Sequence, residues 1–287
     1  MIEKPPPQRT IHYAKGRYVI VLLDLLGQKE VMRQMDPLPQ DPDALNQVVA
    51  KSLGMRSFMQ DQIRQIFYEA FEKMESSDVD QLGKSEADLF RRIRPNMTIR
   101  SNQFADTVVY YALVTDECQF AAMVMSLFFA VGGALLACLA HGVPIRGAIT
   151  SGEAIRTGDT DEIYGGPLVR AFDIEQAAGM PRVLVEPALV DKLKSITESV
   201  GTSFDQSCTR FLSNIAMSMT EVEEDKCISI CYLSGPIRDS RISNSENYKD
   251  LYERAQRFVK GEAEKFASDT KLGPRYSLLL SHFARHP

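Results

Sequence analysis

The sequence predicts an α+β protein in which helices pack on a central sheet of mixed strand direction. Residues 19–27 read Val-Ile-Val-Leu-Leu-Asp-Leu-Leu-Gly, and such an apolar run is typical of a strand buried on both faces. Residues 97–114 alternate in polarity and then become rich in Val and Tyr, which is typical of a hairpin. The predicted order β-α-α-β-β-α-β-α-β differs from the regular alternation of a doubly wound parallel sheet, so a mixed sheet is expected.

The first half of the chain supplies the buried strand, a long helix and the hairpin. Residues 1–16 are expected to form an extended lead-in to a strand at 17–25. A tight turn at Leu26-Gly27-Gln28 then starts a helix that ends at Met35, because three prolines follow between 36 and 43. The other elements predicted here are a helix at 44–74, a polar mobile segment at 75–84, a helix at 86–93 and a hairpin turn at Ala105-Asp106.

The second half begins with a segment from Phe120 to Ala140 that carries no charge. Its length would span a bilayer, but strand-like sequence flanks it on both sides, so a buried helix on the sheet is expected and membrane insertion is not. A subunit contact, where Gly132-Gly133 allow close approach, is one interpretation of this helix. The elements predicted after it are a strand at 143–153, a helix from Gly165 to Gly179, a strand at 181–185, a surface helix at 186–200, a strand at 227–233 and helices at 247–267 and 276–286.

Composition excludes several classes of protein. The 287 residues have a net charge of −5, which argues against a nucleic-acid-binding scaffold. The five cysteines form no CxxC pair and are odd in number, as expected for reduced thiols in the cytoplasm. The four histidines are scattered at 12, 141, 282 and 286, so a histidine-based metal site is not expected. Residues 1–8 lack the apolar core of a secretion signal.

Two aspartates are the candidate functional residues. Asp24 ends the buried strand, where an unpaired carboxylate is costly unless a cation meets it. A helix cap is an equally good interpretation of Asp24 alone, and a routine turn residue is the better one for Asp106 alone. Together, the two carboxylates could hold two Mg²⁺ or Mn²⁺ ions about 3.5–4 Å apart, the spacing used for displacement at phosphorus. The turn Leu25-Leu26-Gly27-Gln28 would offer backbone N–H groups to phosphate oxygens.

These pieces, in this order, resemble the class III nucleotidyl cyclase catalytic domain. The resemblance runs from about Arg17 to Val185, and its best-matched pieces are Asp24-Leu-Leu-Gly27 and Phe104-Ala-Asp106-Thr-Val. Residues 145–152 resemble the next strand of that family, and residues 164–175 resemble its fourth helix. The resemblance implies a ferredoxin-like βααββαβ core, two metal ions held by Asp24, Asp106 and the Leu25 backbone, and head-to-tail homodimers.

The chain departs from the purine cyclases of this family at several positions. Val169 and Asp173 stand where those enzymes place an Asn and an Arg, so Arg170 or Arg146 would have to supply the missing positive charge. At the base-contacting positions, Asn102 and Glu162 stand where adenine-selective members carry Lys and Asp. A site built for one base edge rejects others strongly, so a purine is not the default substrate.

The bacterial pyrimidine cyclases of Pycsar anti-phage defence resemble the chain more closely. That resemblance implies a cytoplasmic enzyme that converts UTP, in preference to CTP, to the 3′,5′-cyclic nucleotide and pyrophosphate. A separate effector would read the product. The alternatives left open are a purine cyclase, a cyclase-like protein that binds nucleotide without turnover, and a purely structural role for both aspartates. The implied organisation is a single catalytic domain at 17–287, with a core at 17–185 and a C-terminal elaboration at 186–287.

Overall fold

The computed structural model describes residues 12–27, 33, 36–72, 97–199, 201–239 and 248–286. Its strands are β1 (Tyr13–Leu25), β2 (Arg100–Phe104), β3 (Thr107–Val114), β4 (Ile145–Thr157), β5 (Ile163–Tyr164), β6 (Val183–Val185), β7 (Thr220–Val222) and β8 (Ile228–Ile230). Its helices are α2 (Pro42–Glu72), α4 (Glu117–Ala140), α5 (Gly166–Ala178), α6 (Pro187–Glu198), α7 (Phe204–Ser218), α8 (Gly235–Asp239), α9 (Tyr248–Lys265) and α10 (Leu272–Arg285).

The strands form one mixed sheet, as the sequence predicts. Its order is β2-β3-β1-β4-β6-β8-β7, with β5 paired to β4 outside this path. The β4–β6 pair is parallel, whereas β1 is antiparallel to both β3 and β4. The apolar run of β1 therefore lies between two neighbours and is covered on both faces.

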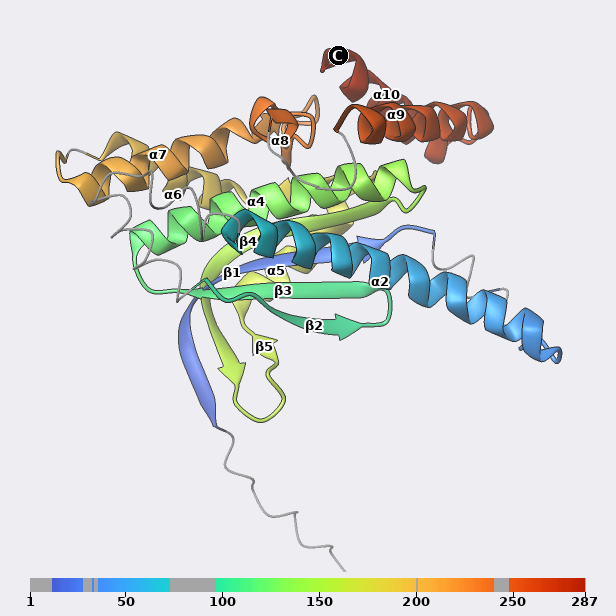
Figure 1. Cartoon of the computed structure of the whole chain (residues 1–287), viewed down its shortest axis with the longest axis horizontal. Helices are drawn as coiled ribbons and strands as arrows, with labels where there is room; N and C mark the ends of the chain where they lie inside the picture. Colours follow the sequence, from blue (N-terminus) through green and yellow to red (C-terminus); the bar gives the residue numbers. More distant parts are fainter. Residues whose placement is uncertain are drawn as a thin grey trace, which may run out of the picture.

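The two faces of β1 enter different cores. Val19, Val21 and Leu23 belong to the large core that α4 and α2 cover. Ile20 and Leu22 belong to a smaller core beneath α5. Figure 1 shows α4 between the sheet and the C-terminal helices. Because side chains alternate along a strand, Asp24 continues the series that faces the α5 side.

The apolar helix α4 is a core helix. It is long and apolar enough to span a membrane, but 89% of its most apolar 18-residue window is buried inside the protein. Helices α2, α7 and α9 pack against it. A Cβ on Gly132 would lie 2.3 Å from Ile237 Cδ1, so this glycine allows close approach of α8 in the same chain. The interpretation of this face as a subunit contact is therefore wrong.

Several predicted boundaries differ from the structure. Residues 13–16 are strand rather than lead-in, because β4 continues to Thr157 and pairs with Tyr13. Helix α6 is not confined to the surface, since Leu189 and Leu193 are fully buried. Elements α7, β7, α8 and the short β5 were not predicted. The predicted segments at 75–84 and 86–93, and nearly all of the helix after Gly27, lie outside the described residues.

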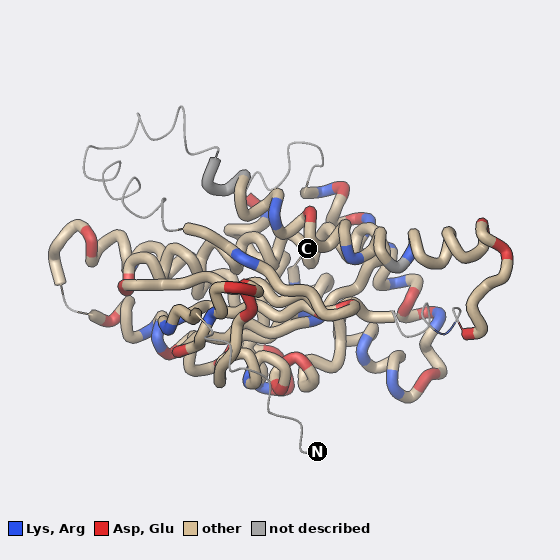
Figure 2. Tube along the Cα trace, turned by 90° about the horizontal axis from the view of Figure 1, so that it is seen from below, with Lys and Arg blue, Asp and Glu red and all other residues tan. Residues whose placement is uncertain are grey.

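Acidic and basic residues are interspersed on the side of the molecule that Figure 2 shows. The blue and red segments of the tube alternate around its periphery rather than gathering into one basic face.

Candidate functional site

Asp24 lies between two polar partners at the end of β1. The register places it opposite Thr107 on β3 and Arg146 on β4. Its Oδ1 accepts a hydrogen bond of 3.0 Å from the Thr107 hydroxyl, and its Oδ2 accepts one of 3.1 Å from Arg146 Nη2. The side chain is 15% exposed. The carboxylate at this strand end is thus paired with a cation, but the cation is a guanidinium of the same chain.

Glu175 is a second buried carboxylate at the same arginine. It lies on α5, and its Oε1 contacts Arg146 Nε. Burial raises the pKa of Glu175, the Arg146 charge lowers it, and the charges of Asp24 and Asp106 raise it further. Sequence reasoning missed Glu175. The signal that could have found it is its spacing with Ala171 and Ala178, which places a carboxylate on the buried stripe of a helix.

Asp106 reaches this group from the hairpin turn between β2 and β3. Its carbonyl accepts a hydrogen bond of 3.4 Å from the Leu25 backbone N–H, which ties the turn to the end of β1. The residue is half-buried, and its charge acts on Glu175. The structure therefore places Asp24, Asp106 and Glu175 in one cluster at the end of β1, where Arg146 contacts Asp24 and Glu175.

The turn after β1 differs from the phosphate cradle that the sequence predicts. The N–H of Leu25 is directed to Asp106, and the N–H of Leu26 donates to Pro144 O at 2.9 Å. Both amides are therefore engaged inside the chain in this structure and are not directed at a phosphate. Gly27 has a φ of +88°, which suits a glycine, and Gln28 lies outside the described residues. The Leu25 side chain is buried, so only its backbone could contact an ion.

The two positions expected to contact the base lie together at the β4–β5 connection. Asn102 donates to Asp161 O at 3.0 Å and accepts from the Ile163 N–H at 3.2 Å. Glu162 accepts hydrogen bonds from Tyr164 and Thr160, which lower the pKa of its carboxyl. In this chain, Asn102 therefore holds β2 to the β4–β5 connection.

Arg170 does not reach Asp24 within one chain. It lies on α5 and donates to Ser151 O at 2.9 Å, while its Nε pairs with Glu186. Ser151 is five residues beyond Arg146 on the same strand, or roughly 16 Å at the usual rise of a β-strand. Two arginines are proposed to supply positive charge, and of these only Arg146 contacts Asp24 and Glu175.

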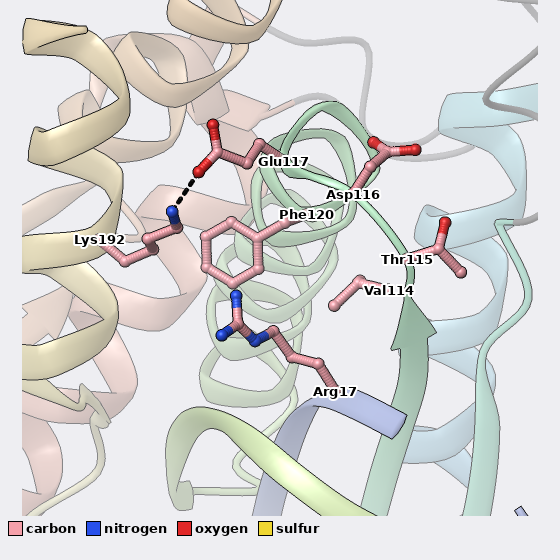
Figure 3. A pocket seen from close by; sticks show the side chains of 7 residues that line it. All are labelled: Arg17, Val114, Thr115, Asp116, Glu117, Phe120 and Lys192. Carbon is pink, nitrogen blue, oxygen red and sulfur yellow. Dashed lines mark hydrogen bonds and ion pairs between the residues drawn. The ribbon is translucent and has the colours of Figure 1, made fainter. Parts of the chain in front are cut away.

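The pocket in Figure 3 lies at the other end of β1. Its volume is about 350 Å³. Figure 3 shows the guanidinium of Arg17 beside the ring of Phe120 and the ion pair between Lys192 and Glu117. Arg17 is seven residues from Asp24, or roughly 23 Å along the strand. This pocket is therefore separate from the cluster of carboxylates around Asp24.

The cluster formed by Asp24, Asp106 and Glu175 has the chemistry of a site for a hard divalent cation. Two of its three carboxylates, those of Asp24 and Glu175, contact the Arg146 guanidinium, and the charge of Asp106 acts on Glu175. Carboxylate oxygens are the ligands that Mg²⁺ and Mn²⁺ prefer. Each carboxylate oxygen has two lone pairs, so Asp24 can accept its present hydrogen bonds and still contact an ion.

Comparison with known proteins finds only distant likenesses. No family model matches the chain, and no curated protein matches it. One similar solved structure is that of the adenylyl cyclase CyaB from P. aeruginosa, with 13% identity and a TM-score of 0.36 over 64% of this chain and 83% of that one. Another is a class III adenylyl cyclase-like ATP-binding protein from Pseudomonas aeruginosa, with 8% identity and a TM-score of 0.38 over 87% of this chain and 44% of that one.

Proposed function

We propose that this protein is a nucleotidyl cyclase that converts a nucleoside triphosphate to its 3′,5′-cyclic nucleotide and pyrophosphate. The observation that carries the proposal is the position of Asp24 at the end of β1 and of Asp106 in the adjoining hairpin turn, where both charges act on Glu175. Asp24 alone could be a helix cap, and Asp106 alone could be a routine turn residue. Because the two residues lie together, their positions support the shared metal-binding role that the sequence predicts.

The residues of the site have separable roles in this proposal. Asp24 and Asp106 bind the cations, and Thr107 and Arg146 hold the Asp24 carboxylate in a fixed orientation. Glu175 holds Arg146 from the α5 side. Bound divalent ions would lower the pKa of the ribose 3′-hydroxyl and offset the triphosphate charge. The hydroxyl oxygen then attacks the α-phosphorus, its proton passes to water, and pyrophosphate leaves.

A head-to-tail homodimer would complete the site. Arg170, Asn102 and Glu162 lie away from Asp24 in one chain, so they could contribute only to the site of a second copy. Exposed apolar side chains lie near these residues: Phe104 is 50% exposed and Val169 is 60% exposed. Apolar side chains of this kind are typical of surfaces that a second protein covers.

The base is proposed to be a pyrimidine, with UTP favoured over CTP. The support is the departure of Asn102 and Glu162 from the Lys and Asp of adenine-selective enzymes, together with Val169 and Asp173 on the exposed side of α5. By the same resemblance, the cyclic product would activate a separate effector in the cytoplasm during anti-phage defence.

One observation favours a second candidate function, a protein that binds nucleotide without turning it over. Both carboxylate oxygens of Asp24 already accept hydrogen bonds from the chain. In addition, Val169 and Asp173 can supply neither the amide nor the positive charge that purine cyclases place at these two positions.

Incubation with each of the four nucleoside triphosphates and Mn²⁺, followed by mass spectrometry, separates these functions. The proposal predicts a cyclic pyrimidine nucleotide, and cyclic UMP in the largest amount, with one pyrophosphate per product. Cyclic AMP or GMP as the main product would instead identify a purine cyclase. Bound nucleotide without any pyrophosphate release would support the second candidate.

A further inference from the structure

Four side chains with metal-binding atoms converge in the C-terminal part of the protein. They are Glu221 on β7, Cys231 just after β8, and His282 and His286 at the end of α10. One ligand atom from each lies within 4.8 Å of the others. The sequence alone predicts no histidine-based metal site, because its histidines are scattered. The fold brings two of them to one cysteine and one carboxylate.

The two histidines are spaced to act together. His282 and His286 are four residues apart, so both project from one face of α10. A metal-binding pair at this spacing needs further ligands from another element, and the β7–β8 hairpin supplies them. Glu221 lies on β7, and Cys231 directly follows β8. The backbone N–H of Cys231 donates a hydrogen bond of 2.8 Å to the carbonyl of Met219, just before β7.

The separations between ligand atoms are close to those around one ion. Cys231 Sγ lies 3.6 Å from His286 Nε2, and that nitrogen lies 3.0 Å from Glu221 Oε2. His282 Nδ1 lies 2.7 Å from Glu221 Oε1. In a tetrahedral zinc site, the usual bond lengths place neighbouring ligand atoms about 3.3–3.7 Å apart. Small side-chain rotations would bring the four atoms to these spacings.

The ring nitrogens of His282 give evidence for a ligand that is independent of the spacing of the four side chains. Its exposed fraction is 3%, yet neither ring nitrogen makes a hydrogen bond of acceptable alignment. The contact of Nδ1 with Glu221 is short, but the carboxylate oxygen lies off the direction of a ring N–H. A buried polar group without an aligned partner destabilises a protein. A cation between the imidazole and the carboxylate would satisfy both.

We propose that these four side chains bind one Zn²⁺ ion, which fastens α10 to the β7–β8 hairpin. The combination of one thiolate, two imidazoles and one carboxylate selects zinc over Mg²⁺ or Mn²⁺, which prefer oxygen ligands alone. Four protein ligands leave no open position, so the ion is structural rather than catalytic. The site lies on the opposite edge of the sheet from the β2–β3 hairpin and does not depend on the proposed cyclase activity.

Metal analysis of the purified full-length protein tests this proposal. After chelation and reconstitution with Zn²⁺, the wild type is expected to retain one zinc per chain and to melt at a higher temperature than the chelated protein. Titration with Co²⁺ is expected to give a thiolate-to-cobalt charge-transfer band, which Cys231→Ser abolishes. His286→Ala removes a partly exposed ligand at a helix end and is expected to reduce retained zinc at least tenfold in a folded protein.

Cys227→Ser and His12→Ala are matched controls, because neither residue belongs to the cluster, and both should retain zinc. Absence of retained zinc and of the charge-transfer band in the wild type would overturn the proposal. So would an unchanged band in Cys231→Ser, or unchanged zinc content in His286→Ala. The alternative, an ion-pair network of Glu221 with the histidines and Arg285, would give a melting temperature that does not respond to zinc.

Discussion

The Asp106→Asn variant is expected to form cyclic nucleotide more than about 100-fold more slowly than the wild type. This loss is larger than the loss caused by removing a residue that only hydrogen-bonds to a metal ligand. An amide has nearly the shape of a carboxylate but lacks the charge that binds a hard cation. Its fold should be intact, because Asp106 lies half-buried in a turn and the hydrogen bond to β1 uses its backbone carbonyl. Initial rates of pyrophosphate release and circular dichroism measure the two effects separately.

Asp191→Asn provides the matched control for this experiment. Asp191 is an exposed carboxylate on α6, and its side chain is 74% exposed. The same change of charge should leave the rate of cyclisation within about twofold of the wild type, as expected of an exposed surface position. Equal rates for Asp106→Asn and Asp191→Asn would exclude a metal-binding role for Asp106.

The Arg146→Met variant is expected to lower the free energy of unfolding by about 3 kcal/mol at neutral pH. Arg146 is the cation of this group, and its removal leaves Asp24 and Glu175 largely buried without a positive partner. Breaking a buried ion pair by removing one member costs about 3–5 kcal/mol, and the partial exposure of Arg146 favours the lower end. Urea denaturation at several pH values measures the effect.

The loss of unfolding free energy in Arg146→Met, relative to the wild type, should become smaller as the pH falls. Burial already raises the pKa of Glu175, and loss of the Arg146 charge raises it further. Protonation of Glu175 in the folded state then removes the unpaired charge, so the deficit is largest above its raised pKa and smaller below it. Arg238→Met, in an exposed pair with Asp239, should cost less than about 1 kcal/mol with little pH dependence. A pH-independent penalty in Arg146→Met would contradict this account of Glu175.

The local patterns of the sequence are sufficient for most of the fold up to β6. The apolar run of β1, the hairpin at 100–114 and the uncharged helix α4 all form where their periodicity and turn residues place them. Helix α7 could also have been predicted, because Ser203 and Gln206 form a capping box at its start. The strand β7 has three residues, so alternation is too short to identify it, whereas β8 lies within the strand predicted at 227–233.

The sites depend on contacts that local patterns do not contain. Asp24 and Asp106 could be paired from the sequence because a strand end and a hairpin turn have defined positions in a sheet. The guanidinium of Arg146 on Asp24 and the amides of Leu25 and Leu26 directed into the chain became visible only in the structure. These contacts depend on the register of β1 with β3 and β4, which no short-range signal specifies.

The central claim is that Asp24 and Asp106 together bind a divalent cation between the end of β1 and the β2–β3 turn. Electron paramagnetic resonance of Mn²⁺ tests it most directly, because bound and free ions give different signal amplitudes in a titration. The account predicts saturable Mn²⁺ binding that is strengthened by nucleoside triphosphate and weakened at least tenfold in both Asp24→Asn and Asp106→Asn. Mn²⁺ affinities that are the same in the wild type and in both variants, with and without nucleotide, would contradict it.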